Sequence, residues 1–388
     1  MKPFTFHNPT KIVFGEGTVD QVGAETKAIG RKALFVYGQA SIRRSGLYDR
    51  IVASLKGAGV AWVEHPGVKP NPVLSHVRRG IALAREHGVD CLLAVGGGSV
   101  IDAAKAIAAG AASTTDVWAF YDGSATVERA LPLATVLTLP ATGSEMNGGT
   151  VITNEATQDK FGFGAPPLFP RVSILDPAVT RTLPRSQTAY GTADAMTHLL
   201  EGYFTHDGGW TPLQDRYAEG VIRSLMESAD RVLADPQDLE ARAVQMWGAT
   251  LAWNTLAPCG LGAFTIPNHM LEHPISAVYD IAHGAGLSIV LPAWMAFEAG
   301  RRGPERFARF ARSVLGVTVA DDAAAAAEGT SRLKAWFDRA GTPTSFGAAG
   351  IADPDLDRLA ELALKLCARW QIPGYAKGDL VAIYQRCR

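Results

Sequence analysis

Short apolar runs of β-favouring residues alternate with stretches of helical periodicity in the first part of the chain. Apolar runs at residues 33–37, 91–95 and 134–139 each lead into a helix-like stretch or a loop of small residues, and a shorter run lies at residues 60–63. Strands that are apolar on both faces and separated by helices are typical of a parallel sheet covered on both sides. This pattern predicts an α/β domain over residues 1–180.

The β-like runs end near residue 183, and helical periodicity dominates the rest of the chain. We therefore expect an all-helical domain over residues 181–388, joined to the α/β domain, with a cleft between the two. Domain clefts are favoured positions for cofactors and substrates. The expected helices are residues 185–204, 215–233, 239–254, 304–315 and 355–369.

Length and charge narrow the class of partner. The chain has 388 residues, with 37 Lys and Arg against 38 Asp and Glu, and no run of five like charges. This balance argues against nucleic acid and against a membrane surface as partners, and no segment has the roughly 18 consecutive apolar residues of a membrane span. The N-terminal residues predict no secretory signal, and four widely spaced cysteines predict reduced thiols. We expect a cytoplasmic protein with a small-molecule partner.

Three glycines follow the apolar run at residues 91–95, where the predicted strand turns into a helix. Glycines let the backbone approach a ligand closely, and the N–H groups at a helix start favour a phosphate. The same pattern fits an ordinary tight turn, and Asp102 also fits simple compensation of the helix dipole. A second loop, at residues 138–147, is rich in hydroxyl groups, which suit a sugar or a pyrophosphate.

Acidic and imidazole side chains in the second half of the chain form a candidate metal site. Asp194 and His198 are four residues apart, on one face of a predicted helix. One carboxylate with three imidazoles is a ligand mixture that suits Zn²⁺ or Fe²⁺, although any one histidine alone is more simply a core residue. The candidate set is Asp194, His198, His269 and His283, with His273 close by and His206 as a weaker alternative.

These motifs occur together, and in this order, in a known family. The segments GGGSVIDAAK (96–105), TLPATGSEMN (138–147) and HMLEHPISAVYDIAHG (269–284) resemble the iron-containing (group III) alcohol dehydrogenase family. The resemblance covers almost the whole chain. It implies a homodimeric, dinucleotide-dependent oxidoreductase with a Rossmann-like N-terminal domain and an all-α C-terminal domain, an architecture like that of dehydroquinate synthase, and one divalent metal, Fe²⁺ or Zn²⁺.

The resemblance also implies a role for individual residues, carried over by position. The implied metal ligands are Asp194, His198, His269 and His283. His273 corresponds to a further active-site histidine near the nicotinamide and Asp102 to a contact near the same ring, so both are expected catalytic residues. The implied cofactor contacts are Gly38, Ser41, Asn71, Gly97, Gly98, Ser99, Asp102, Thr138, Thr142, Asn147 and Lys160.

The end of the predicted strand at residues 33–37 bears on the choice of coenzyme. Many NAD-preferring members have an Asp there, whose carboxylate accepts hydrogen bonds from the adenosine ribose, whereas this chain has Gly38. Without that carboxylate a 2′-phosphate is not repelled, and Ser41 could donate to it, with Arg43 or Arg44 adding charge. The pattern is similar to the branch of NADPH-dependent butanol dehydrogenases and broad-range aldehyde reductases. We therefore expect NADP(H) in preference to NAD(H).

The predicted activity is hydride transfer between NADP(H) and an aldehyde or primary alcohol, with aldehyde reduction as the expected direction. The metal motif has no accompanying basic cluster, which argues against a carboxylated or phosphorylated substrate. A metal- and NAD-dependent lyase of the dehydroquinate-synthase type shares the architecture and is the main alternative. A non-enzymatic metal-binding protein is a second alternative, which the glycine and hydroxyl loops disfavour.

Overall fold

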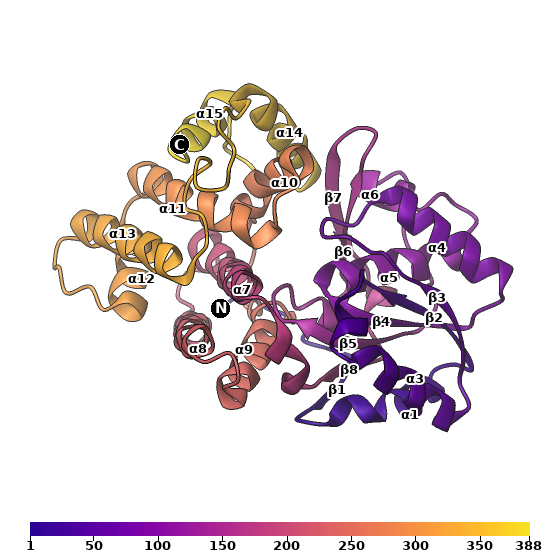
Figure 1. The fold of residues 1–388 in the computed structure, drawn as a ribbon. Coiled ribbons are helices and arrows are strands. Elements are labelled where there is room, and N and C mark those ends of the chain that lie inside the picture. Colours follow the sequence, from indigo (N-terminus) through magenta and orange to yellow (C-terminus); the bar gives the residue numbers. More distant parts are fainter. The chain divides into compact units, whose positions relative to one another are not determined.

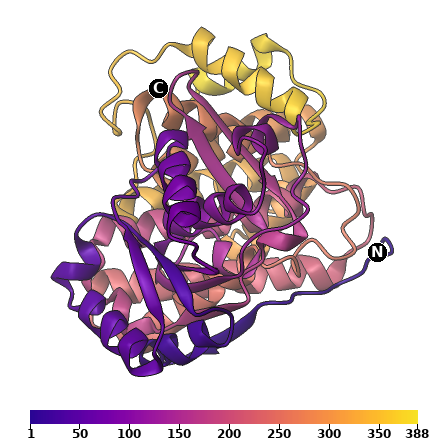
Figure 2. The same ribbon diagram turned by 90° about the vertical axis from the view of Figure 1, so that its right-hand side faces the viewer.

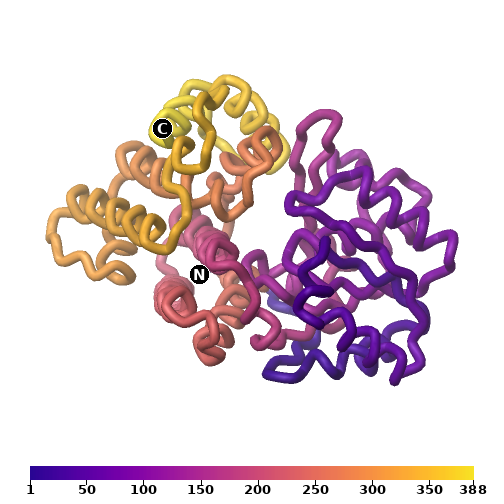
Figure 3. The backbone as a smooth tube through the Cα atoms, in the orientation of Figure 1, coloured from indigo at the N-terminus to yellow at the C-terminus, as the bar shows by residue number.

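The computed structural model describes residues 1–388, which form two compact units. The α/β unit comprises His7–Leu183 and Pro236–Asn254, and the helical unit comprises Met1–Phe6, Pro184–Asp235 and Thr255–Arg388. Figure 3 follows the backbone as it passes from one unit to the other. The predicted fold class, an α/β domain with a parallel sheet joined to an all-α domain, is confirmed.

The α/β unit is built on a sheet of six parallel strands (Figure 1). The strands are β1 (Lys11–Phe14), β2 (Lys32–Tyr37), β3 (Ala61–His65), β4 (Cys91–Gly97), β5 (Leu133–Leu139) and β8 (Val172–Leu175). Their order in the sheet is β1-β8-β5-β4-β2-β3. Since β2 and β4 are neighbours, with Tyr37 opposite Val95, the segments that follow these two strands emerge at the same edge of the sheet.

Helices cover both faces of this sheet, which explains why its strands are apolar on both sides. The helices are α1 (Val22–Lys27), α2 (Ser41–Arg44), α3 (Leu47–Ala58), α4 (Leu74–Glu86), α5 (Gly98–Ala111) and α6 (Trp118–Asp122). Leu34 and Val36 of β2 pack with α4 and α5 in one core cluster. Phe35 and Tyr37 of the same strand pack with α1 and α3 in the other.

An antiparallel hairpin, absent from the sequence analysis, follows the second loop. Its strands are β6 (Gly149–Asn154) and β7 (Asp159–Gly164). The ring of Trp118 stacks on Phe161 with centroids 5.6 Å apart, and the hydroxyls of Tyr121 and Thr150 share a 2.7 Å hydrogen bond. These contacts fix the hairpin against α6. The sequence did not predict these strands because polar residues and glycines interrupt their apolar pattern.

One helix belongs to a different unit from the one expected. The sequence analysis placed residues 239–254 in the all-helical domain, but α9 (Leu239–Ala252) packs with the α/β unit. Arg242 of α9 is buried and donates to Pro236 O at 2.7 Å and to Thr180 Oγ1 at 3.4 Å. Met246 joins the core cluster of α4 and α5. Helical periodicity alone does not identify the unit against which a helix packs, so the chain order was misleading here.

The helical unit surrounds α7 (Arg185–Thr205), most of which is buried. The other helices are α8 (Pro212–Ala234), α10 (Pro267–Tyr279), α11 (His283–Arg302), α12 (Glu305–Leu315), α13 (Asp322–Ala340), α14 (Leu356–Arg369) and α15 (Lys377–Gln385). Helices α8, α10, α11 and α13 contact α7, and the yellow pair in Figure 2, α14 and α15, pack against each other. A helix that is enclosed on all sides loses the amphipathic stripe of a surface helix.

Two further expectations concern the chain as a whole. All four cysteines (Cys91, Cys259, Cys367 and Cys387) are free, as their spacing predicted, and the structure buries all of them. None of the helices combines the length and the apolar composition needed to span a bilayer.

A close approach between α7 and α11 gives a test of this packing. A Cβ added at Gly284, in the first turn of α11, would lie 2.1 Å from the backbone oxygen of Tyr190. Gly284→Ala is therefore expected to lower the free energy of unfolding by about 1–3 kcal/mol, because α11 must shift. Thermal unfolding of the purified variant measures this change as a lower melting temperature.

The matched control is Gly300→Ala in the same helix, where an added Cβ meets nothing within 4 Å. This variant is expected to melt at the same temperature as the wild type or slightly above it, because alanine favours the helix by up to about 1 kcal/mol. Equal melting temperatures for the two variants would contradict the proposed steric contact.

Candidate metal centre and coenzyme-binding loops

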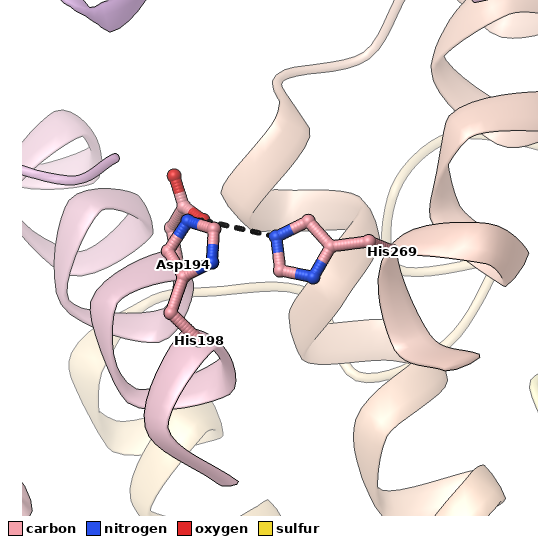
Figure 4. A group of neighbouring side chains, drawn as sticks. All are labelled: Asp194, His198 and His269. Atoms are coloured by element: carbon pink, nitrogen blue, oxygen red, sulfur yellow. Dashed lines mark ion pairs between the residues drawn. The ribbon is translucent and has the colours of Figure 1, made fainter. Parts of the chain in front are cut away.

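Asp194 and His198 lie one turn apart on α7 and project toward His269 of α10 (Figure 4). Asp194 Oδ1 lies 3.2 Å from His198 Nε2 and 3.7 Å from His269 Nε2. His283, the first residue of α11, places its Nε2 atom 3.8 Å from the same oxygen. The structure thus brings together the four residues predicted as metal ligands, with three imidazoles directing the same ring nitrogen at one carboxylate.

These distances fit a small divalent cation. Ligand atoms around a tetrahedral zinc ion, with bonds of about 2.0–2.1 Å, lie about 3.4 Å apart. Asp194 Oδ1 and His269 Nε2 are both buried and have no hydrogen-bond partner. Buried polar atoms without partners are uncommon in folded proteins. A cation bound among these residues would satisfy both atoms, so the residues present fit the metal that the sequence predicted.

Two buried glutamates hold the outer sides of the imidazoles. Glu201 Oε2 accepts from His269 Nδ1 at 2.5 Å, and its other oxygen accepts from the backbone N–H groups of Asn268 and His269 at 2.6 and 2.9 Å. Glu272 accepts from His283 Nδ1 and from the Ser276 hydroxyl. An Nδ1–H bonded to a carboxylate leaves the Nε2 lone pair for a metal ion.

The sequence analysis identified neither Glu201 nor Glu272. A single glutamate in a helical stretch usually indicates a solvated face. Glu201 does follow Asp194 by seven residues, two helical turns along the same face, and Glu272 lies inside the histidine-rich segment. These two positions along the chain are the only local signals for the two residues.

The charges of this region favour a bound cation. Asp194, Glu201 and Glu272 are three carboxylates with 3% of their surface exposed or less, and burying such charges is costly unless they are paired. Burial alone would raise the pKa of Asp194, but the nearby imidazoles of His198, His269 and His283 hold it well below its usual value. Burial lowers the pKa of His269, but the charge of Glu201, its hydrogen bond with His269 and the charge of Asp194 raise it to about 10. The region therefore attracts positive charge.

His273 lies one turn beyond His269 on α10 and is buried. Its ring centroid is 6.4 Å from that of His269 and 5.6 Å from that of His283, and the ring of Trp370 lies edge-on to it at 5.0 Å. This position is beside the four candidate ligands. The weaker alternative, His206, lies elsewhere, with its ring nitrogens near Gly208 N at 3.1 Å and Thr211 Oγ1 at 3.4 Å.

In the α/β unit, the two predicted coenzyme loops lie against each other. Gly97 ends β4, and Gly98 begins α5, whose N-terminus has no side-chain cap, so its N–H groups are oriented for a phosphate. A Cβ at Gly98 would lie 2.5 Å from side-chain atoms of Thr142. Glycine is therefore required at this position for the two loops to meet.

A buried lysine joins the loops. Lys105 of α5 is fully buried and donates to Ser144 Oγ, Asn147 O and Gly149 O, each at 2.8 Å. Burial lowers the pKa of this ammonium group to about 8, although the charges of nearby carboxylates raise it. The sequence analysis did not single out Lys105. Its position, one turn after Asp102 in the glycine motif, is the signal that was available.

Asp102 also serves this junction. One of its carboxylate oxygens accepts from Ser144 Oγ at 2.6 Å and the other from the backbone N–H of Val151 at 3.0 Å. Asn147, another predicted coenzyme contact, donates to Thr142 O at 3.3 Å and to Trp253 O at 3.1 Å. Both side chains shape the loop internally, and their direct contact with a coenzyme stays a prediction.

The remaining predicted contacts lie in or next to strands and helices of this unit. Lys160 of β7 donates to Asn71 Oδ1 at 3.0 Å, and both side chains are buried. Thr138, in β5, and Ser99, in the first turn of α5, are half-buried. Gly38 directly follows β2, and Ser41 is exposed at the start of α2.

The geometry predicts that ligand variants lose metal and that the His273 variant does not. Asp194→Ala and His269→Ala are expected to leave the protein without bound metal after reconstitution and dialysis, because each removes a central ligand atom. His273→Ala is expected to bind one equivalent and to lose rate only. Elemental analysis of the three proteins measures this, and metal loss confined to His273→Ala would reverse the assignment.

Glu201 provides a second test, of the carboxylate behind His269. Glu201→Gln is expected to weaken metal binding by about 10–100-fold, the usual effect of removing such a partner, as measured by competition with a chromophoric chelator. Glu219→Gln is the matched control, since Glu219 is another buried glutamate of this unit. Its carboxylate accepts a 2.8 Å hydrogen bond from the hydroxyl of Tyr203, which is not one of the candidate ligands. Equal metal affinities for the two variants would contradict the role of Glu201.

Comparison with known proteins agrees with this geometry. Residues 9–177 match the family model described as "Iron-containing alcohol dehydrogenase", and residues 188–387 match "Fe-containing alcohol dehydrogenase family, C-terminal". The chain is 42% identical over 385 residues to the probable NADH-dependent butanol dehydrogenase 1 of Bacillus subtilis, covering 99% of each chain. It is 36% identical over 355 residues to the NADPH-dependent aldehyde reductase YqhD of Escherichia coli, covering 90% of each.

Solved structures give the same result for the fold. The crystal structure of NADH-dependent butanol dehydrogenase A from Thermotoga maritima superposes with a TM-score of 0.96 at 44% identity, covering 100% of this chain and 99% of that one. On the matches to both halves and on these relatives, the chain belongs to the iron-containing alcohol dehydrogenase family.

Proposed function

We propose that this protein is a metal-dependent oxidoreductase that interconverts aldehydes and primary alcohols with a nicotinamide dinucleotide. One observation carries the proposal: Asp194 Oδ1 lies within 3.8 Å of the Nε2 atoms of three histidines. Its family membership already identifies the protein as an oxidoreductase that acts on alcohols or aldehydes. The substrate, the coenzyme and the direction are the proposed parts.

The divalent ion, when bound, supplies Lewis-acid polarisation of the carbonyl group, and the reduced nicotinamide supplies the hydride. The role of the protein's own residues is to hold these groups. Asp194 and the three histidines would hold the ion, with Glu201 and Glu272 fixing two of the rings. The glycine turn at Gly97 and Gly98 would bind the pyrophosphate at the start of α5.

His273 is the proposed source of the proton that completes the alcohol. An imidazole has an ordinary pKa of about 6.5, suited to proton transfer near neutrality. Its ring lies beside those of His269 and His283, which places it next to the candidate metal ligands. Asp102 is the second predicted catalytic residue, but its bonds to Ser144 and Val151 favour a positioning role in the coenzyme loops.

The charges around the candidate ligands favour a neutral substrate. The strongest charge influences on Asp194, His198 and His269 come from one another, from His283 and from Glu201. A lyase of the dehydroquinate-synthase type must bind a multiply charged substrate with basic groups. The alternative activity is therefore less well supported than reduction of an unfunctionalised aldehyde.

We propose NADH rather than NADPH as the preferred coenzyme, which reverses the expectation from sequence. Gly38 does leave space for a 2′-phosphate, since an added Cβ would only meet Val68 O at 3.5 Å. However, Arg43, expected to add charge there, already pairs with Glu64 at 2.8 Å. The relatives are named for both coenzymes: four butanol dehydrogenases at 38–43% identity are named for NADH. YqhD at 36% identity is named for NADPH, and an alcohol dehydrogenase of Entamoeba histolytica at 31% identity is named for NADP.

Aldehyde reduction is the proposed direction near neutral pH, because that reaction consumes a proton. The homodimer that the family resemblance implied and the cytoplasmic location expected from the cysteines belong to the same proposal.

The assay that tests the proposed function uses protein reconstituted with Zn²⁺ or Fe²⁺, with each reduced coenzyme and a series of straight-chain aldehydes. Oxidation of NADH is expected with several aldehydes and is expected to be faster than oxidation of the matching alcohols by NAD⁺. Asp194→Ala, reconstituted in the same way, is the control for metal dependence. Failure of the metal-loaded wild type to oxidise either coenzyme with any aldehyde would refute the proposal.

A further inference from the structure

Four side chains form a compact cluster where β2 and β3 end: Tyr37, Arg43, Tyr48 and Glu64, here called the Glu64 cluster. Glu64 Oε2 accepts from Tyr37 Oη at 2.5 Å and from Arg43 Nη2 at 2.8 Å, and its Oε1 atom accepts from the Tyr48 hydroxyl. Both oxygens of this carboxylate are therefore occupied by side chains of its own unit.

Arg43 is held on three sides within this cluster. Besides its bond to Glu64, it donates to Tyr37 Oη at 2.7 Å. Its guanidinium carbon lies 3.8 Å from the ring centroid of Tyr48, close enough for a cation–π contact. An isolated surface ion pair has little effect on side-chain position, but an aromatic ring and two oxygens together define where this guanidinium lies.

Glu64 keeps its charge in this setting. Burial would raise the pKa of its carboxyl group, but the hydrogen bonds from Tyr37 and Tyr48 and the charge of Arg43 hold that pKa below its ordinary value. The carboxylate is therefore ionised at neutral pH and remains an anionic partner for Arg43.

The sheet topology places the cluster beside the expected adenosine end of the coenzyme. The glycine turn follows β4, and β2 is the neighbouring strand. In folds of this type the ribose nearest the adenine lies over the end of the strand next to the phosphate turn. Here that strand ends at Tyr37 of the cluster, and Arg43 follows Ser41 by two residues in α2. Arg43 is thus a cation that a 2′-phosphate could recruit.

We propose that Glu64 is a specificity-determining residue for the coenzyme. By holding the guanidinium of Arg43 against Tyr37 and Tyr48, Glu64 keeps it from binding a 2′-phosphate and so favours NADH over NADPH. This inference rests on the proposed function, because it requires a dinucleotide at this edge of the sheet. It differs from the expectation at Gly38, since it depends on a residue of β3 that would not itself contact the coenzyme.

Direct binding of nucleotide fragments tests the proposal without turnover. Isothermal titration calorimetry compares adenosine 2′,5′-bisphosphate with adenosine 5′-monophosphate, which differ only in the 2′-phosphate. Glu64→Gln is expected to tighten binding of the bisphosphate about tenfold, as one new charge-assisted contact would, while the monophosphate affinity stays within about twofold. NADPH affinity is expected to rise in parallel.

A double-mutant cycle identifies Arg43 as the released group. Arg43→Ala alone is expected to change bisphosphate affinity by about twofold or less, whereas in the Glu64→Gln background it is expected to remove the gain. Tyr37→Phe, which deletes a bond to each partner, is expected to give a smaller gain in the same direction, and it serves if Glu64→Gln unfolds. Arg44→Ala reports whether the other arginine of α2 binds the phosphate instead.

Asp116→Asn is the matched control. Asp116 pairs with Arg78 at 2.8 Å in the same unit, so this variant also neutralises one carboxylate and releases one arginine. It is expected to leave all nucleotide affinities unchanged. An equal gain in the control would indicate a general charge effect and overturn the proposal.

Two other results would overturn the proposal. The first is an unchanged bisphosphate affinity in both Glu64→Gln and Tyr37→Phe. The second is a tenfold loss of bisphosphate affinity on Arg43→Ala alone, which would show that Arg43 already binds the phosphate. Failure of the proposed function is distinguishable from these results. A wild type that binds neither NADH nor adenosine 5′-monophosphate would remove the proposed function together with this inference, whereas normal NADH binding without the shift would remove the inference alone.

Discussion

The helical unit depends on the burial of one carboxylate among imidazoles. Asp194 has 3% of its surface exposed, and a carboxylate in such a place is stable only with partners of opposite charge or strong donors. The partners come from α7, α10 and α11, and each pair of these helices has its own contact. Glu201 binds α7 to the start of α10, Glu272 binds α10 to His283 of α11, and Gly284 lets α11 approach α7 closely. The relative placement of the three helices is therefore coupled to the candidate metal centre.

The α/β unit contains a buried charge of the opposite sign, with a different outcome. Lys105 donates to oxygens of Ser144, Asn147 and Gly149, so the chain itself satisfies its ammonium group. Asp194 Oδ1 and His269 Nε2 have no hydrogen-bond partner in the chain. This contrast separates a charge that shapes a loop from charges arranged for a ligand. Preorganised loops of the first kind reduce the ordering required when a ligand binds.

Charge near an expected phosphate site is a poor guide to phosphate binding unless the partners of that charge are known. Arg43 follows β2 closely enough to suggest a contact with a 2′-phosphate. Its guanidinium is nevertheless committed to Glu64, which comes from the neighbouring strand 21 residues later in the chain. A guanidinium already paired with a carboxylate is held in place and its charge is partly offset, which opposes its movement to a new anion.

The sequence by itself determined the features that depend on near neighbours. Continuous apolar runs located four strands of the parallel sheet, β2, β3, β4 and β5, and helical periodicity located α7, α8, α9, α12 and α14. The glycine turn marked the β4–α5 junction, and four-residue spacing placed Asp194 and His198 on one helical face. Only the tertiary structure decided the unit to which α9 belongs, and only it paired Glu201 with His269 and Glu64 with Arg43. Local patterns reflect the conformation of one or two helical turns, whereas the partner of a buried charge is set by contacts between residues far apart in the chain. A glutamate looks the same in sequence whether it faces solvent or holds an imidazole in place.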